Sequence, residues 1–244
     1  MEPIVSEGPE CDLEEMIDRL RNKYMIQIED FLAPLVWERS RDAFKVLVAT
    51  LLTQNSTDKS AMVAFENLEK EIGISPDKLA SASIEEIAKA IRPAGLHNNK
   101  AKNIREISKI IHESFHDLLE DILNQSPDKA REILVSMPGI GTKTADVVLL
   151  ICKGYRTFPV DTHIFRISRR LGIEGRNYSE ISSVWVRHVK DPLNAHLLLI
   201  THGRKTCKAV KPKCQECVLI DCCQYYLGVL RSERHDTTRG RGAK

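Results

Sequence analysis

Apolar residues recur along most of this chain at the spacing of an α-helix. In SIEEIAKAIRPAGL, which starts at Ser83, apolar residues return every three or four positions, and in KAKNIREISKIIHESF four isoleucines form one stripe. The segment AFKVLVATLL at 43–52 is apolar on nearly every side, which is typical of a central buried helix. Further helices are expected at 126–137, 142–153, 161–171 and 182–189. Period-two alternation is scarce, so the pattern predicts an all-α fold.

The two ends of the chain lack this pattern. Residues 231–244, RSERHDTTRGRGAK, have no apolar anchors and are expected to form a basic flexible tail, and residues 1–10 look similarly loose. The longest apolar run, VVLLIC at 147–152, is far too short to cross a membrane. The acidic start, MEPIVSEGPECDLEE, resembles no targeting signal, so an intracellular protein is expected, in the cytoplasm or nucleoid if the source is prokaryotic.

The small net charge of +2 hides a division between the two halves. From Gly139 onward the chain has 19 lysines and arginines against 9 acidic residues, whereas residues 1–138 carry a net charge of −8. A basic half is typical of a protein that binds a polyanion such as nucleic acid. An ordinary solvated surface is the alternative.

Two helices are separated only by the residues PGIG, in the stretch VSMPGIGTKTADVVLL. Gly139 and Gly141 permit positive φ and close approach of another backbone, and Ile140 is expected to pack between the helices. The second helix then starts with exposed backbone N–H groups, which bind phosphate well. A plain helical corner is the alternative reading of this segment alone.

At this point the sequence resembles a known family. MPGIGTKTADVVL is similar to the helix–hairpin–helix element of the endonuclease III family of DNA glycosylases. The resemblance continues, in unbroken order over roughly residues 30–225, through LLTQNSTDKS, AGLHNNKAKNI and VDTHIFRISRRLG to a group of cysteines. The hairpin by itself is a weak indication, because many non-catalytic DNA-binding proteins contain one; the combination is specific.

Five of the seven cysteines fall within 17 residues. Four thiolates at Cys207, Cys214, Cys217 and Cys223 can hold a 4Fe–4S cluster, and a structural zinc ion is the competing interpretation. The x6-x2-x5 spacing resembles the family's cluster signature and favours iron–sulfur. Cys222 departs from the pattern, since it stands beside the fourth ligand and could replace it. The remaining Cys11 and Cys152 are interpreted as ordinary small apolar residues.

The loop between the first two of these cysteines carries three lysines without an acidic neighbour in the loop, namely Lys208, Lys211 and Lys213. We expect them to bind DNA phosphates, and we expect a cluster that is structural and takes no part in the reaction. A monovalent cation at the hairpin is a further candidate ligand.

The resemblance implies covalent chemistry at two positions. Lys143, in the first turn after the hairpin, matches the nucleophile, and Asp161 in VDTH matches the essential acid. An amine must be neutral to attack, yet a free lysine has a pKa of about 10.4. A phosphate contact by Lys143 and a helix cap by Asp161 are the structural alternatives, although capping and catalysis are compatible for Asp161.

Chemistry at the sugar requires the damaged nucleotide to leave the base stack, and something must fill the gap. By resemblance Asn55 and Leu96 insert into the duplex, with Gln54 adjacent and able to share the work. Related sequences often have Gln where Asn55 stands, so the preference for the opposite base stays open. His163 is a candidate for lining the base pocket or supporting the site.

The resemblance implies two helical lobes with DNA in the cleft. Residues 36–155 would form a six-helix barrel with the hairpin. Residues 1–35, with a helix near 11–32, and residues 156–230 would form a second lobe with the cluster, and residues 231–244 the tail. The implied function is that of a bifunctional DNA glycosylase/AP lyase of base excision repair, acting on oxidised pyrimidines such as thymine glycol. A mismatch glycosylase acting on adenine, or on thymine or uracil opposite guanine, and a non-enzymatic DNA-binding module are the alternatives. Nothing in the sequence demands an oligomer, so a monomer that binds damaged duplex DNA is expected.

Overall fold

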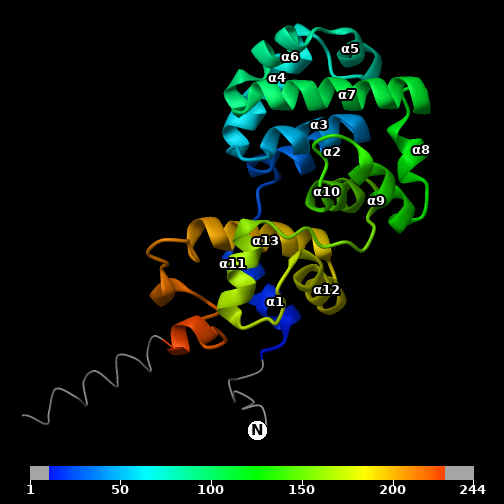
Figure 1. The fold of residues 1–244 in the computed structure, drawn as a ribbon. Helices are drawn as coiled ribbons and strands as arrows, with labels where there is room; N and C mark the ends of the chain where they lie inside the picture. Colours follow the sequence, from blue (N-terminus) through cyan, green and yellow to red (C-terminus); the bar gives the residue numbers. More distant parts are fainter. Residues whose placement is uncertain (1–10, 229–244) are drawn as a thin grey trace, which may run out of the picture. The chain divides into compact units, whose positions relative to one another are not determined.

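A computed structural model describes residues 11–228, and its regular secondary structure over this range is entirely helical. The predicted all-α class is therefore confirmed. The chain forms two compact units, one from residues 27–159 and the other from the segments on either side of it, up to residue 26 and from residue 160 (Figure 1).

The unit of residues 27–159, called the central unit because it lies in the middle of the sequence, is built around two helices. Helix α3 (Ala43–Thr53) is buried along almost its whole length, as its apolar pattern predicts. Helix α7 (His97–Phe115) packs against α3 on one side and against α5 and α6 on the other (Figure 1). The other elements are η1 (Ile28–Asp30), α2 (Leu32–Ser40), α4 (Asp58–Glu71), α5 (Pro76–Ser81), α6 (Ile84–Ala90), η2 (Arg92–Ala94), α8 (Leu119–Leu123), α9 (Pro127–Ser136) and α10 (Thr142–Lys153).

Local sequence signals set several of these helix boundaries. Ser83 caps α6 in a reciprocal capping box with Glu86. Pro127 occupies the first turn of α9, where its missing N–H costs nothing. Gly154 ends α10 in the left-handed conformation, at φ +63°. The helices predicted at these places therefore begin and end for local reasons.

The second unit contains α1 (Leu13–Lys23), α11 (Thr162–Leu171), α12 (Tyr178–His188), α13 (Pro192–Lys205) and the short η3 (Cys214–Glu216). Helix α13 is the centre of its packing, with contacts to both α1 and α11. Trp185 of α12 is fully buried, and its indole N–H donates to the Ser168 hydroxyl of α11 at 2.8 Å. This bond satisfies the one polar group of the largest core side chain.

The structure differs from the sequence-based boundaries at the start of the chain. The helix expected near 11–32 ends at Lys23, because Tyr24 adopts an extended conformation, and η1 follows separately. The chain passes between the units at 26/27 and 159/160, whereas the family resemblance implied boundaries at 35/36 and 155/156. Residues 27–35 belong with the central unit because α2 packs on α3 and α10. The expected tail at 231–244 and the loose start at 1–10 lie outside the described residues.

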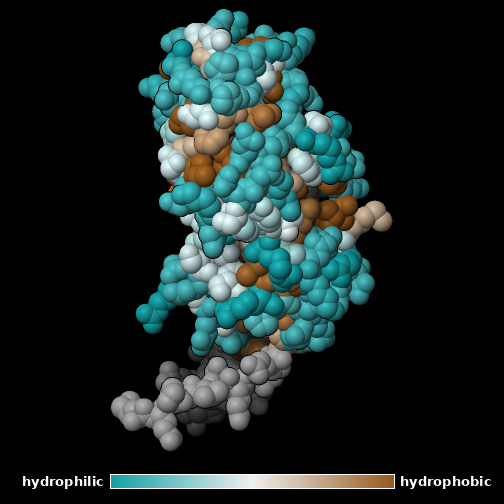
Figure 2. Space-filling view, turned by 90° about the vertical axis from the view of Figure 1, so that its right-hand side faces the viewer, coloured by the Kyte–Doolittle hydropathy of each residue, from teal (hydrophilic) through white to brown (hydrophobic). Residues whose placement is uncertain are grey.

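The face in Figure 2 is mostly hydrophilic, with apolar side chains in small patches. None of the helices in residues 11–228 is both long and apolar enough to cross a membrane.

The connection between α9 and α10 is the hairpin seen in the sequence. Gly139 has φ +77°, and a Cβ atom there would lie 2.2 Å from the Asn103 side-chain nitrogen of α7. Ile140 is 4% exposed, so it packs inside the hairpin as expected. Gly141 has φ −93° and open space where a Cβ would stand. Only the first of the two glycines is therefore required by the fold itself.

We expect Gly139→Ala to lower the thermal midpoint of unfolding by roughly 2–8 °C. A side chain in the left-handed region costs roughly 1–2 kcal/mol, and each kcal/mol corresponds to about 2–4 °C for a chain of this size. Gly141→Ala is the matched control and should leave the midpoint nearly unchanged. Equal decreases in the two variants, measured by thermal denaturation, would contradict this account of the hairpin.

Candidate functional site

Lys143 lies in the first turn of α10, directly after the hairpin, and its side chain is half-buried. The N-cap residue of α10 is Gly141, so no side chain caps this helix. The backbone N–H groups of the first turn and the positive end of the helix dipole are therefore available to an anion such as a phosphate. The same positive end disfavours an ammonium, by about 0.3–1 kcal/mol.

Gln54 joins the loop after α3 to this hairpin. Its side-chain amide donates to the Gly139 carbonyl at 3.1 Å and to the Thr144 hydroxyl at 3.0 Å. Gln54 is thus hydrogen-bonded to the hairpin, and its share in DNA insertion stays a prediction. Nothing in the sequence signals this bond, because the partners are 85 and 90 residues apart.

Asn55 and Leu96 stay exposed, and both have an unusual backbone. Their φ angles are +49° and +47°, in the left-handed region that residues other than glycine seldom adopt. Leu96 is 59% exposed, which leaves a large apolar side chain in water. Strained backbone of this kind is concentrated at functional sites. Their insertion into DNA stays a prediction.

Asp161 lies in the other unit and caps α11. Its carboxylate accepts the backbone N–H of Ile164 at 2.8 Å, so the expected capping role is observed. A pocket of about 540 Å³ opens beside it. Its lining combines apolar side chains with three arginines and consists of Val160, Asp161, Thr162, Phe165, Arg166, Arg169 and Arg170.

His163 is not among the residues that line this pocket. Its side chain lies so close to Gly203 of α13 that a Cβ atom there would be 2.7 Å away. Its Nδ1 accepts a hydrogen bond from Arg166 at 3.1 Å. Burial lowers the pKa of His163, so its ring is neutral at neutral pH. These contacts give His163 a supporting position between α11 and α13.

Two arginines of α11, one turn apart, hold the start of the cysteine loop. Arg166 donates to the carbonyl oxygens of Gly203 and Cys207, at 3.1 and 2.9 Å. Arg170 donates to the Lys208 carbonyl at 2.8 Å and approaches the Cys207 sulfur at 3.2 Å. The helix that begins with Asp161 therefore also positions the first cysteine of the group, a link that the sequence pattern did not indicate.

The four cysteines expected to bind a cluster are all unpaired and partly buried. The Cys217 sulfur accepts the Leu219 N–H at 3.4 Å and lies 3.7 Å from Nε2 of His202. Burial raises the pKa of Cys217 to about 11, and it also raises that of Cys223. Thiols of this kind need a bound cation to become thiolates.

The spacing of these sulfurs discriminates between metals. Four thiolates around one zinc ion lie about 3.8 Å from one another, as the Zn–S distance of about 2.3 Å requires. Within residues 11–228 the one set of three potential ligand atoms within 4.8 Å of one another is that of Cys11, Asp221 and Cys222. No three of the four expected cysteine sulfurs are therefore as close together as the ligands of a single zinc ion would be.

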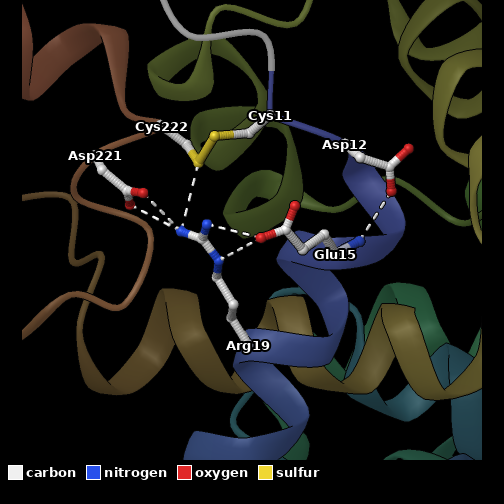
Figure 3. Close-up of polar contacts among 6 residues, drawn as sticks. All are labelled: Cys11, Asp12, Glu15, Arg19, Asp221 and Cys222. Atoms are coloured by element: carbon white, nitrogen blue, oxygen red, sulfur yellow. Dashed lines mark hydrogen bonds and ion pairs between the residues drawn. A yellow bond between two sulfur atoms is a disulfide. The ribbon is translucent and has the colours of Figure 1, made fainter.

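Cys11 and Cys222 correct two interpretations from the sequence. They form a disulfide across 211 residues, so Cys11 is not simply a small apolar residue and Cys222 is not available as a ligand (Figure 3). Arg19 of α1 reinforces the link, because it pairs with Asp221 at 2.8 Å and with Glu15 at 2.8 Å. The positive charge of Arg19 beside Asp221 also makes Cys11, Asp221 and Cys222 unsuitable as ligands of a cation. The sequence alone could not pair Cys11, since no spacing rule connects the two ends of a chain.

The lysines in the loop differ from one another. Lys208 and Lys211 are exposed, whereas Lys213 pairs with Glu216 at 3.3 Å. Lys213 therefore does have an acidic neighbour, which lies just beyond the loop, and part of its charge is compensated.

Known proteins resemble this chain over most of its length. Residues 48–185 match the family model described as HhH-GPD superfamily base excision DNA repair protein. Endonuclease III of Sulfolobus acidocaldarius is 44% identical over 219 residues, covering 88% of this chain and 96% of the relative. Endonuclease III of Escherichia coli K12 is 35% identical over 185 residues, covering 75% and 83%.

Solved structures agree with these relatives. The structure of a non-covalent endonuclease III–DNA complex superposes with a TM-score of 0.74 at 27% identity, covering 89% of this chain and 96% of the other. A trapped endonuclease III–DNA covalent intermediate gives 0.73 at 27% identity, with the same coverage. The hairpin, the uncapped α10 and the four spaced thiols thus occur in the expected framework, and this chain belongs to the endonuclease III family within the HhH-GPD superfamily of base excision DNA repair proteins.

Proposed function

We propose that this protein is a bifunctional DNA glycosylase/AP lyase that removes oxidised pyrimidines, such as thymine glycol, from duplex DNA. The position of Lys143 carries the proposal: a half-buried amine in the first turn of an uncapped helix, next to a glycine hairpin suited to phosphate. The trapped covalent complex of a related endonuclease III supports an enzyme–DNA bond as part of the chemistry.

The proposed reaction begins with the neutral amine of Lys143. It attacks C1′ of the sugar, the glycosidic bond breaks, and the base leaves with the bonding electrons and takes up a proton. The ring opens to a Schiff base, loss of a proton from C2′ expels the 3′ phosphate, and water then releases the lysine. Desolvation, as DNA covers the site, is the main force that favours the neutral amine, because the helix end contributes less than one pKa unit.

Asp161 is the proposed acid of the reaction. The Asp161 carboxylate uses one lone pair to accept the N–H of Ile164. Its other lone pairs can stabilise positive charge at C1′ and exchange protons with the Lys143 amine. The adjacent pocket supplies apolar walls and arginines that suit a nucleotide. We propose that Lys143 is the nucleophile and Asp161 the acid of this one reaction.

Borohydride reduction tests the nucleophile. Wild-type protein mixed with a thymine-glycol duplex should give a reduced covalent adduct, and Lys143→Gln should give none, because an amide forms no Schiff base. Asp161→Asn should keep duplex binding and lose most turnover. The readouts are gel-resolved adduct, strand cleavage and DNA affinity. An adduct with Lys143→Gln would assign the nucleophile elsewhere.

The same experiment separates the alternatives. A monofunctional mismatch glycosylase would release a base from a G:T, G:U or adenine mismatch and form no adduct. A DNA-binding module without activity would leave abasic and oxidised duplexes intact.

We propose a 4Fe–4S cluster held by Cys207, Cys214, Cys217 and Cys223. The x6-x2-x5 spacing of the cysteines in the sequence and the donors at two of the sulfurs support it. When bound, the cluster supplies a structural cross-link among four points of the chain. The protein's own residues, with Arg166 and Arg170 foremost, keep the first cysteine in place.

Metal analysis of two neighbouring variants tests this ligand set. Cys223→Ser should lose most of the iron and the visible absorbance, whereas Cys222→Ser should retain both, because the disulfide with Cys11 already uses that sulfur. Iron retained in Cys223→Ser and lost in Cys222→Ser would exchange the two roles. One zinc per chain without iron would refute the cluster.

The lysine loop is proposed to bind DNA phosphates. Replacing Lys208, Lys211 and Lys213 with Gln should make the dependence of log affinity on log salt shallower, by about 0.9 for each phosphate that is no longer neutralised. Lys213 should contribute least, because Glu216 compensates its charge. Binding titrations over a range of salt concentrations measure the slope, with thermal denaturation as the control for folding. An unchanged slope would exclude this loop from phosphate binding.

A further inference from the structure

Lys100 of α7 is a buried lysine, with 5% of its surface exposed. Its ammonium donates to two backbone carbonyl oxygens, that of Leu52 at 2.8 Å and that of Ala94 at 3.0 Å. Both carbonyls lie at the C-terminal ends of helical elements, α3 and η2. Such carbonyls lack helical partners and carry partial negative charge, so a cation is well placed between them.

The two carbonyls immediately precede the exposed loops described above. Leu52 is three residues before Asn55, and Ala94 is two residues before Leu96. Asn55 and Leu96 both have positive φ. One ammonium therefore joins the two segments that are proposed to enter the DNA duplex.

We propose that Lys100 is a positioning residue that holds these two insertion loops at the separation needed to replace an extruded nucleotide. The proposal rests on the proposed function, since it presumes base removal from a duplex. In this proposal the Lys100 side chain is buried and does not contact DNA, yet it determines how Asn55 and Leu96 approach the duplex.

Helix α7 also contacts the hairpin. Asn103, one turn beyond Lys100 on α7, packs against Gly139. Gln54, in the first of the two loops, donates to the Gly139 carbonyl. Helix α7 therefore contacts both the hairpin, which is proposed to bind phosphate, and the segments that lead into the two insertion loops. Binding of the DNA strand at the hairpin then also fixes where the inserted residues lie.

Stability by itself is a poor reason for a charge at this place. Burial disfavours the ammonium and lowers the pKa of Lys100 to about 8. An apolar side chain of similar length would avoid that desolvation cost. The lysine instead links two segments, because an ammonium with three N–H groups can donate to a carbonyl of each segment at once. We therefore expect its effect on base extrusion to exceed its effect on folding.

The test compares two steps in Lys100→Met under single-turnover conditions. One substrate is a thymine-glycol duplex, from which the base must be extruded and excised, and the other is the same duplex with an abasic site. Extrusion is least costly where no base has to be unstacked, so loose insertion loops should matter mainly for the first substrate. We expect excision to fall on the order of 10- to 100-fold, with cleavage of the abasic site changing by less than about threefold.

The matched control is Lys102→Met, at an exposed position on the same helix. It should behave like the wild type on both substrates.

The outcomes separate this proposal from the proposed function. Equal decreases on the two substrates would indicate a merely structural lysine and overturn the proposal, as would unchanged excision. Failure of the wild type on both substrates would instead refute the proposed function. If Lys100→Met does not fold, Lys100→Gln, which keeps an amide NH2 as a donor group, should show the same split with a smaller decrease. Absence of the split in that variant would overturn the proposal.

Discussion

The organisation of this protein depends on the backbone groups that helix ends leave unpaired. An all-helical chain satisfies its main chain internally everywhere except in the first and last turns. The candidate chemistry lies at these ends: Lys143 at the uncapped start of α10, Asp161 at the start of α11, and Lys100 between the last carbonyls of α3 and η2. Each of these side chains lies beside the partial charge that the unpaired backbone groups give to a helix end.

Helix α11 shows how one element can serve two purposes. Its first turn places the proposed acid, and its later turns carry the arginines that hold the Cys207 segment. Helix α11 therefore connects the cysteine loop, where the cluster is proposed to bind, with the turn that carries Asp161.

Helix α7 has the corresponding role in the central unit. Its outer faces pack on α5 and α6, while Lys100 and Asn103 contact the loop ends and the hairpin. The proposed DNA-contacting segments are short, and two of them have strained backbone. A short strained loop keeps its conformation only where its surroundings determine it, which is the function of these buried contacts.

Local and periodic features were decided by the sequence itself. The isoleucine stripe of α7, the cap at Ser83 and the corner at Gly139 act within a few residues, so the all-α class and the hairpin could be predicted. The motifs that identify the family, VDTHIFR and the cysteine spacing, are likewise contiguous and readable. The end of the helix expected near 11–32 was not, because Tyr24 adopts an extended conformation directly after Lys23 and its hydroxyl bonds to the distant Thr206.

Pairings between distant residues were decided only by the tertiary structure. The bond from Gln54 to the hairpin, the disulfide between Cys11 and Cys222 and the two carbonyls that bind Lys100 join groups with no shared spacing. A lysine in the NNKAKN segment reads as a surface residue, since nothing nearby in the chain shows that two helix ends converge on it. Periodicity determines which face of a helix is buried; only packing determines which groups meet there.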